Sequence, residues 1–251
     1  MVRTTLLSAA LLAAVSVQGA PPATRVPVLV ELFTSEGCSS CPAADALLAT
    51  LQRDQPIDRA QVVPIGLHVD YFDHEGWKDP FSSPAFTERQ RNYSQLFGPD
   101  SVYTPQIVVN GTQAIEGNDG ERVRRAILAA AGRTHWPIGL TARVSGARVR
   151  MTVELPAAPQ GAERIQTLWA ITQDGLTTEV KRGENGGRTL HHVAVARRLQ
   201  VLGPLGRQAA VVERETSMDR RWGALGLNAV VWLQGVKTRQ VYGAATTRIV
   251  P

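Results

Sequence analysis

The two cysteines of this 251-residue chain, Cys38 and Cys41, lie where an apolar run gives way to a helical pattern. Residues 28–33 are almost entirely apolar, which predicts a buried strand. Apolar residues then recur at the spacing of a helix: Ala43, Ala46, Leu47 and Leu51. The pair is therefore predicted at the start of a helix, where unpaired N–H groups and the helix dipole favour a thiolate over a thiol.

Only two residues separate Cys38 from Cys41, so a disulfide can close between them. We expect Cys38 to be exposed and able to attack, and Cys41 to be shielded in the first helical turn and able to resolve. A Cys-x-x-Cys pair placed between a strand and a helix is typical of redox proteins, with a structural disulfide or half of a metal site as the alternatives. A four-thiolate zinc site within one copy is excluded, because the chain has no further cysteine.

The N-terminus has the pattern of a secretory signal peptide, predicted over residues 1–20. Arg3 precedes an uncharged run over residues 6–17, and small residues follow it. The run is too short to span a bilayer, and no second span is expected in the mature chain. We therefore expect a periplasmic or secreted protein in an oxidising compartment, with an uncleaved N-terminal anchor as the alternative.

The charge of the chain does not indicate a nucleic-acid partner. The formal net charge is +5, but basic residues are scattered among acidic ones. Short pairs such as Arg197–Arg198 are interpreted as solvated surface, and we expect no nucleic-acid binding.

The first half of the chain predicts alternating strands and helices. Beyond the cysteine motif, the pattern predicts strands over residues 62–69, 106–110 and 113–117 and helices over residues 83–97 and 119–132. The order is strand, helix, strand, helix, strand, strand, helix.

This order, with Cys-Ser-Ser-Cys-Pro at a helix start and Thr104-Pro105 before a hairpin and a last helix, resembles the thioredoxin fold. The resemblance implies a cis Pro105 beside the dithiol, with Thr104 and Pro105 pairing with the substrate backbone; a trans proline on an edge strand is the alternative. It also implies a buried carboxylate beneath the resolving cysteine, a role we give to Glu31 as a catalytic base. The alternative for Glu31 is a polar pocket or an ion pair with an arginine.

Further motifs are similar to those of the family of secreted thioredoxin-like proteins called DUF1223, whose name denotes an unknown function. They are the run Glu-Leu-Phe-Thr-Ser-Glu-Gly before Cys38, and residues 68–71, 76–80, 89–90 and 103–106. His68 and Trp77 could line the rim of the dithiol site; the alternatives are a hydrogen-bonded core histidine and a tryptophan that fills a gap.

From residue 138 onward the pattern changes to short apolar or alternating segments separated by turns. Such a pattern indicates an antiparallel sandwich. The expected fold class is an α/β thioredoxin-like N-terminal domain over residues 26–134, followed by an all-β sandwich domain over residues 138–251.

These features favour a thiol-disulfide oxidoreductase that exchanges the Cys38–Cys41 disulfide with protein thiols or disulfides, and that requires no cofactor or metal. One alternative is a Cu(I) carrier that uses the two thiolates and His68. Another is a non-catalytic adaptor that acts through the sandwich. The oligomeric state is not predicted.

Overall fold

The structure is a computed structural model that describes residues 25–223 and 225–250, so the signal peptide predicted at residues 1–20 lies outside the described residues. Its three α-helices, within those ranges, are α1 (Cys41–Asp54), α2 (Pro84–Phe97) and α3 (Gly120–Ala131). Two short 3-10 helices are η1 (Pro99–Ser101) and η2 (Arg220–Trp222). The strands of the first half are β1 (Val26–Thr34), β2 (Ala60–His68), β3 (Gln106–Val109) and β4 (Gln113–Glu116).

The second half of the described chain is built from strands. They are β5 (Gly139–Ser145), β6 (Arg148–Leu155), β7 (Ile165–Gln173), β8 (Leu176–Glu179), β9 (Thr189–His192), β10 (Val195–Pro204), β11 (Ala210–Ser217), β12 (Leu227–Gly235) and β13 (Val241–Arg248). The strands and helices predicted from the apolar pattern are confirmed, whereas the short hairpin of β8 and β9 was not predicted.

Helix starts follow ordinary capping rules. Ser83 caps α2 by accepting a hydrogen bond from the Ala85 N–H at 3.3 Å, and Asp119 caps α3 by accepting one from the Arg122 N–H at 3.0 Å. Helix α1 differs, because the side chain of its cap residue Ser40 makes no capping bond. The N–H groups at this end are therefore not satisfied by a side-chain cap.

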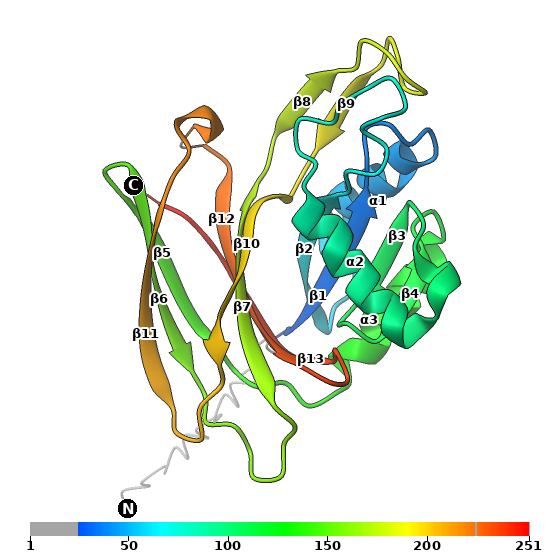
Figure 1. The fold of residues 1–251 in the computed structure, drawn as a ribbon. Coiled ribbons are helices and arrows are strands. Elements are labelled where there is room, and N and C mark those ends of the chain that lie inside the picture. The colour runs from blue at the N-terminus through cyan, green and yellow to red at the C-terminus, as the bar shows by residue number, and fades with distance from the viewer. Residues whose placement is uncertain (1–24, 224, 251) are drawn as a thin grey trace, which may run out of the picture.

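The predicted fold class is wrong, because strands from both halves form one sheet. Eight strands pair in the order β13-β12-β7-β10-β2-β1-β3-β4, so β10 of the second half lies beside β2 of the first (Figure 1). The seam is narrow: Val195 pairs with Gly66, and the Gly66 N–H donates to the Ala194 carbonyl at 2.8 Å. A separate all-β domain following a thioredoxin-like domain is therefore not what this chain forms.

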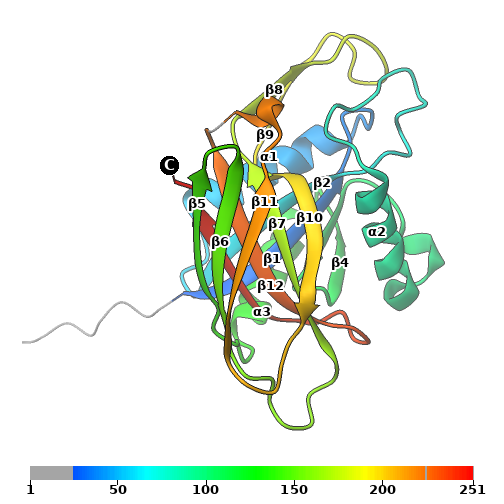
Figure 2. The same cartoon turned by 60° about the vertical axis from the view of Figure 1, so that its left-hand side comes forward.

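Three apolar clusters hold the layers together. The first packs α1 and α3 against one face of the sheet, with Val30, Leu32 and Leu48 among its members. The second lies on the other face beneath α2 and contains residues of both halves, including Phe33 and Trp232. The third fills the space between the large sheet and a second sheet of order β11-β6-β5 (Figure 2). Because the second cluster is shared, the two halves have a common core.

The β8–β9 hairpin projects from the second half toward the start of α1. Both views show it above the N-terminal end of that helix (Figures 1 and 2). The hairpin therefore brings residues near position 190 to the cysteine motif.

Candidate active site: a disulfide under a hairpin

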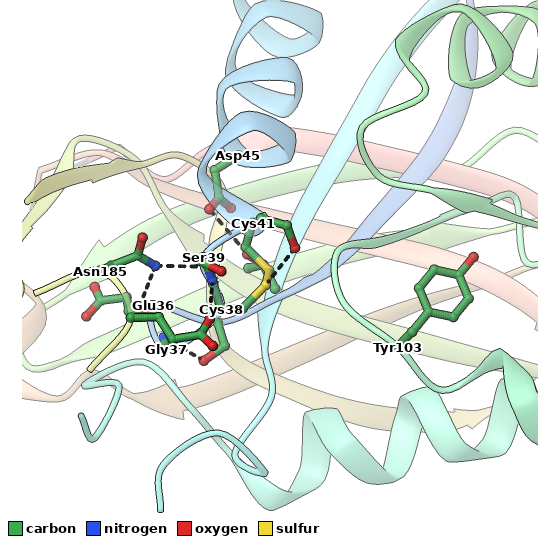
Figure 3. Close-up of a disulfide and its surroundings, with 12 residues drawn as sticks. Glu36, Gly37, Cys38, Ser39, Cys41, Asp45, Tyr103 and Asn185 are labelled. Carbon is green, nitrogen blue, oxygen red and sulfur yellow. Dashed lines mark hydrogen bonds between the residues drawn. A yellow bond between two sulfur atoms is a disulfide. The ribbon is translucent and has the colours of Figure 1, made fainter. Parts of the chain in front are cut away.

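Cys38 and Cys41 form a disulfide at the junction of β1 and α1 (Figure 3), with their Cα atoms 5.4 Å apart. Cys38 lies in the turn after β1, and Cys41 is the first residue of α1. The turn is held by its own backbone, because the Cys38 N–H donates to the Ser35 carbonyl and the Cys41 N–H to the Cys38 carbonyl, both at 3.2 Å. Cys41 is therefore held where the helix dipole favours a thiolate.

The expectation that Cys38 is exposed is wrong. Its side chain is only 3% exposed, and Cys41 is completely buried. The residues between them, Ser39 and Ser40, are exposed. Solvent and partner molecules therefore reach this site at the serines, with Cys38 just beneath the surface.

The hairpin loop of the second half is hydrogen bonded to the turn that carries the disulfide. Asn185 is buried and donates from its side-chain amide to the carbonyls of Glu36 and Cys38, at 2.9 Å each (Figure 3). The neighbouring Glu184 accepts a hydrogen bond from the Ser39 N–H at 2.9 Å. The second half thus fastens the turn that carries Cys38.

A buried polar network lies behind this turn, with Glu36 at its centre. The Glu36 carboxylate accepts hydrogen bonds from the Trp77 indole N–H at 2.8 Å and from His192 at 3.1 Å. The Glu36 N–H donates to Asp79, which also binds Nδ1 of His68 at 2.7 Å. The network ties together β2, the loop after it, the cysteine turn and β9.

His68 and Asp79 behave as a buried ion pair. Burial alone would lower the pKa of His68, but the negative charge and hydrogen bond of Asp79 more than offset this and raise it. Burial likewise acts to raise the pKa of Asp79, and the His68 charge and hydrogen bonds lower it on balance. His68 is thus a hydrogen-bonded core residue, while Trp77 is partly buried and linked to the cysteine turn through Glu36.

Glu31 is not brought together with the cysteines. Alternation along β1 turns Val30 and Leu32 toward the α1 face, and Glu31 toward the opposite face with Phe33. There it is fully buried and forms an ion pair with Arg89 of α2. The environment of Glu31 is thus the arginine pair that we gave as the alternative to a catalytic base.

The pair Thr104–Pro105 lies on the α1 side of the molecule and is joined by a cis peptide bond. A Cβ atom placed on Gly117 would be 2.7 Å from Cβ of Pro105 and 3.0 Å from Cβ of Ala44. Pro105 is therefore packed near the first turn of α1, close to the cysteine motif.

Asp45 is a residue of the site that sequence reasoning missed. It lies one helical turn after Cys41, and its carboxylate is drawn beside the disulfide in Figure 3. The Thr34 hydroxyl donates to it at 3.2 Å. Burial raises the pKa of Asp45, although the nearby His192 and His68 act in the opposite direction. The spacing of four residues after Cys41 is a signal that could have identified it.

Asn185, Glu184 and His192 were also missed as site residues. They come from a hairpin about 150 positions away in the sequence, and no local pattern connects them with Cys38.

In residues 25–223 and 225–250 no group of three or more His, Cys, Asp or Glu side chains is arranged to hold a metal ion. The Cu(I) hypothesis placed His68 beside the two thiolates; Nδ1 of His68 binds Asp79, which leaves Nε2 as the ring nitrogen that could meet a metal ion. No helix in the same ranges is long and apolar enough to cross a membrane.

The chain is one of the class of proteins in which a Cys-x-x-Cys disulfide lies between a strand of a mixed β-sheet and the helix that follows it. Within that class, the chain belongs to the family described as "Protein of unknown function (DUF1223)", whose model matches residues 29–234.

Solved structures with the same overall fold are known. A crystal structure of a protein from Agrobacterium tumefaciens is similar, with a TM-score of 0.69, 25% identity, and coverage of 89% of this chain and 94% of that one. HBP35 of Porphyromonas gingivalis gives a TM-score of 0.67 at 14% identity, with coverage of 91% and 77%; this likeness concerns the fold alone. No curated protein sequence matches the chain.

Proposed function

We propose that this protein is a thiol-disulfide oxidoreductase that exchanges its Cys38–Cys41 disulfide with cysteines of partner proteins. The observation that carries the proposal is that both cysteines of the chain form one disulfide at the start of α1. Neither cysteine links distant segments of the chain.

The small size of the ring supports a chemical role. A disulfide stabilises a fold mainly by restricting the unfolded chain, and the effect grows with the length of the loop that it closes. The Cys38–Cys41 disulfide joins residues only three positions apart, in a turn already fixed by backbone hydrogen bonds. As a structural staple it would therefore add little.

The exchange would begin with a partner thiolate attacking Sγ of Cys38. A new bond forms between the partner sulfur and Cys38, the Cys38–Cys41 bond breaks, and Cys41 leaves as a thiolate that then takes up a proton. A second partner thiol displaces Cys38, so that the partner becomes a disulfide and this protein a dithiol. The reverse sequence reduces a partner disulfide. Cys38 is the expected point of attack because it lies nearer the surface than Cys41.

The setting of the proposal is an oxidising compartment, in the periplasm or outside the cell. Disulfides persist there, and the signal peptide predicted at residues 1–20 would direct the chain to it.

The test is to trap the mixed disulfide with a defined probe. A Cys41→Ala variant should form a stable adduct with a peptide carrying one activated cysteine, detected by mass spectrometry. The matched Cys38→Ala variant should react at least tenfold more slowly, because its remaining sulfur is fully buried. If the native disulfide were reduced only when urea unfolds the chain, the disulfide would be structural and the proposal would fail.

A further inference from the structure

Asp45 lies where it can serve the buried sulfur of Cys41. In a helix, side chains four residues apart are neighbours on the same face, and both residues belong to α1. The carboxylate of Asp45 is beside the disulfide in Figure 3. Pro42, the residue after Cys41, lines the same surface pocket as Asp45.

This pocket gives Asp45 a route to solvent that Cys41 lacks. Its volume is about 400 Å³, and it lies between α1 and β9. Cys41 is completely buried, whereas Asp45 is only partly buried. A proton that moves between solvent and Cys41 therefore needs a neighbouring group to carry it, and Asp45 occupies the intermediate position.

The Asp45 carboxylate forms no ion pair with the described residues. Among the described residues no Lys, Arg or His nitrogen lies within 4.0 Å of it, and it accepts a hydrogen bond from the Thr34 hydroxyl at 3.2 Å. Other charged or titratable groups face it or line the same pocket: His68 of β2, Asp79 of the following loop, Arg188, His191 and His192 of the hairpin, and Arg53 of α1. Burial raises the pKa of Asp45 in this setting, which brings a carboxyl group closer to the range of useful acid–base exchange.

We propose that Asp45 exchanges the proton of Cys41 during disulfide exchange. When the Cys38–Cys41 bond opens, the leaving Cys41 thiolate takes a proton from the Asp45 carboxyl group, which regains one from the pocket. When Cys41 resolves a mixed disulfide, the Asp45 carboxylate accepts the thiol proton and the resulting thiolate attacks Cys38; the Cys38–Cys41 bond forms, the bond from Cys38 to the partner sulfur breaks, and the partner leaves as a thiolate. This inference rests on the proposed function, and it gives Asp45 the role that the sequence had suggested for Glu31.

The test compares Asp45→Asn with Asp54→Asn, which removes a carboxylate at the exposed end of the same helix. In each full-length variant, a mixed disulfide between Cys38 and a small thiol is formed, and its resolution by Cys41 is followed from pH 5 to pH 9. Asp45→Asn should slow resolution about tenfold or more near pH 6.5, with the effect shrinking toward pH 9, where hydroxide replaces the carboxylate. Asp54→Asn should leave the pH profile unchanged.

The sign of the effect separates proton transfer from simple electrostatics. If Asp45 acted only as a nearby negative charge, its removal would favour the Cys41 thiolate and speed resolution at low pH. Faster resolution in Asp45→Asn, or a profile equal to that of Asp54→Asn, would overturn the inference.

A control on Cys38 distinguishes this failure from failure of the function. The Cys41→Ala variant, with Asp45 in place, should form the mixed disulfide at Cys38, because that step does not need the Cys41 proton. If this adduct forms but Asp45→Asn has no effect on resolution, only the role of Asp45 is wrong; if no adduct forms, the proposed function is wrong.

A measurement on the unsubstituted protein keeps the test independent of folding of the variant. Carboxyl carbon NMR should show a different titration midpoint for Asp45 in the reduced and the oxidised protein, because the Cys41 proton is present only in the first. Identical midpoints in the two states would contradict the inference.

Discussion

Replacing Arg89 should destabilise this protein severely without changing the rate of disulfide exchange at Cys38. Arg89 is 11% exposed and its partner Glu31 is fully buried. A further Arg89 nitrogen lies 3.1 Å from the Tyr93 hydroxyl and 3.2 Å from the side-chain oxygen of Gln234 in β12. The guanidinium group also lies over the ring of Trp232, at 5.2 Å from its centroid. One side chain thus connects β1, α2 and the second half.

The expected cost follows from the carboxylate that Arg89→Met leaves behind. Removing one partner of a buried ion pair costs about 3–5 kcal/mol, because the remaining charge is uncompensated. The free energy of unfolding of a typical domain is about 5–15 kcal/mol, so the loss is a large fraction of the total. With a urea m-value of about 3 kcal/mol/M, the unfolding midpoint should fall by about 1–1.7 M.

The assay is urea unfolding followed by tryptophan fluorescence, on oxidised full-length protein. The double variant Arg89→Met, Glu31→Gln should recover at least half of the loss, because it leaves no buried charge. The rate at which Cys38 forms mixed disulfides should stay within about twofold, since Glu31 lies on the face of the sheet away from α1. A double variant as unstable as the single one would show that the uncompensated Glu31 charge is not the cause of the loss. A large loss of exchange rate in Glu31→Gln alone would show that Glu31 takes part in the thiol chemistry.

Three further predictions concern the cysteine site. Asn185→Ala should cost about 1–3 kcal/mol, from two lost hydrogen bonds at a buried position, and should speed alkylation of the first cysteine in the reduced protein; equal alkylation rates would show that the hairpin does not cover it. Gly117→Ala should lower the unfolding midpoint, because its Cβ would lie 2.7 Å from that of Pro105; an unchanged midpoint would contradict this close packing. The pair of His68 and Asp79 should stabilise most between about pH 4 and 6.5, since a lowered Asp pKa loses its contribution as pH falls and a raised His pKa loses its contribution as pH rises. Asp79→Asn should flatten this dependence in urea titrations at successive pH values, and a profile identical to the native one would argue against the ion pair.

The local elements could be predicted from the sequence because they depend on spacing along the chain. Helix α1 follows from apolar residues at helical intervals, and β1 follows from an apolar run. The joining of the two halves could not be predicted, because it depends on Val195 and Gly66 meeting at a seam of one paired position. Nothing in either local pattern specifies that contact. The change near residue 138 to short strand-like segments was therefore mistaken for the start of a separate all-β domain.

Some features of the candidate site could likewise be predicted from the sequence, and others could not. The disulfide and its place at a helix start follow from the spacing of Cys38 and Cys41. The side on which a strand residue lies is harder to predict when both faces are buried, as in β1, because an apolar run has no alternation to reveal it. The strand pattern could therefore not decide between the two readings of Glu31, the base implied by the thioredoxin resemblance and the arginine ion pair, while Asp45, four residues after Cys41, satisfied a helical rule that could have been applied.

The burial of Cys38 is compatible with disulfide exchange. The hairpin holds the cysteine turn through the two hydrogen bonds from Asn185 and one from the Ser39 N–H to the exposed Glu184. Breaking the two buried bonds costs about 1–3 kcal/mol, which corresponds to an opened state roughly 5- to 150-fold less populated than the closed one. Exchange that requires Asn185 to detach would be slowed by about that factor, and a partner that binds the exposed serines and displaces Asn185 would recover it. The hairpin therefore limits which molecules reach Cys38 more than it limits how fast an accepted partner reacts.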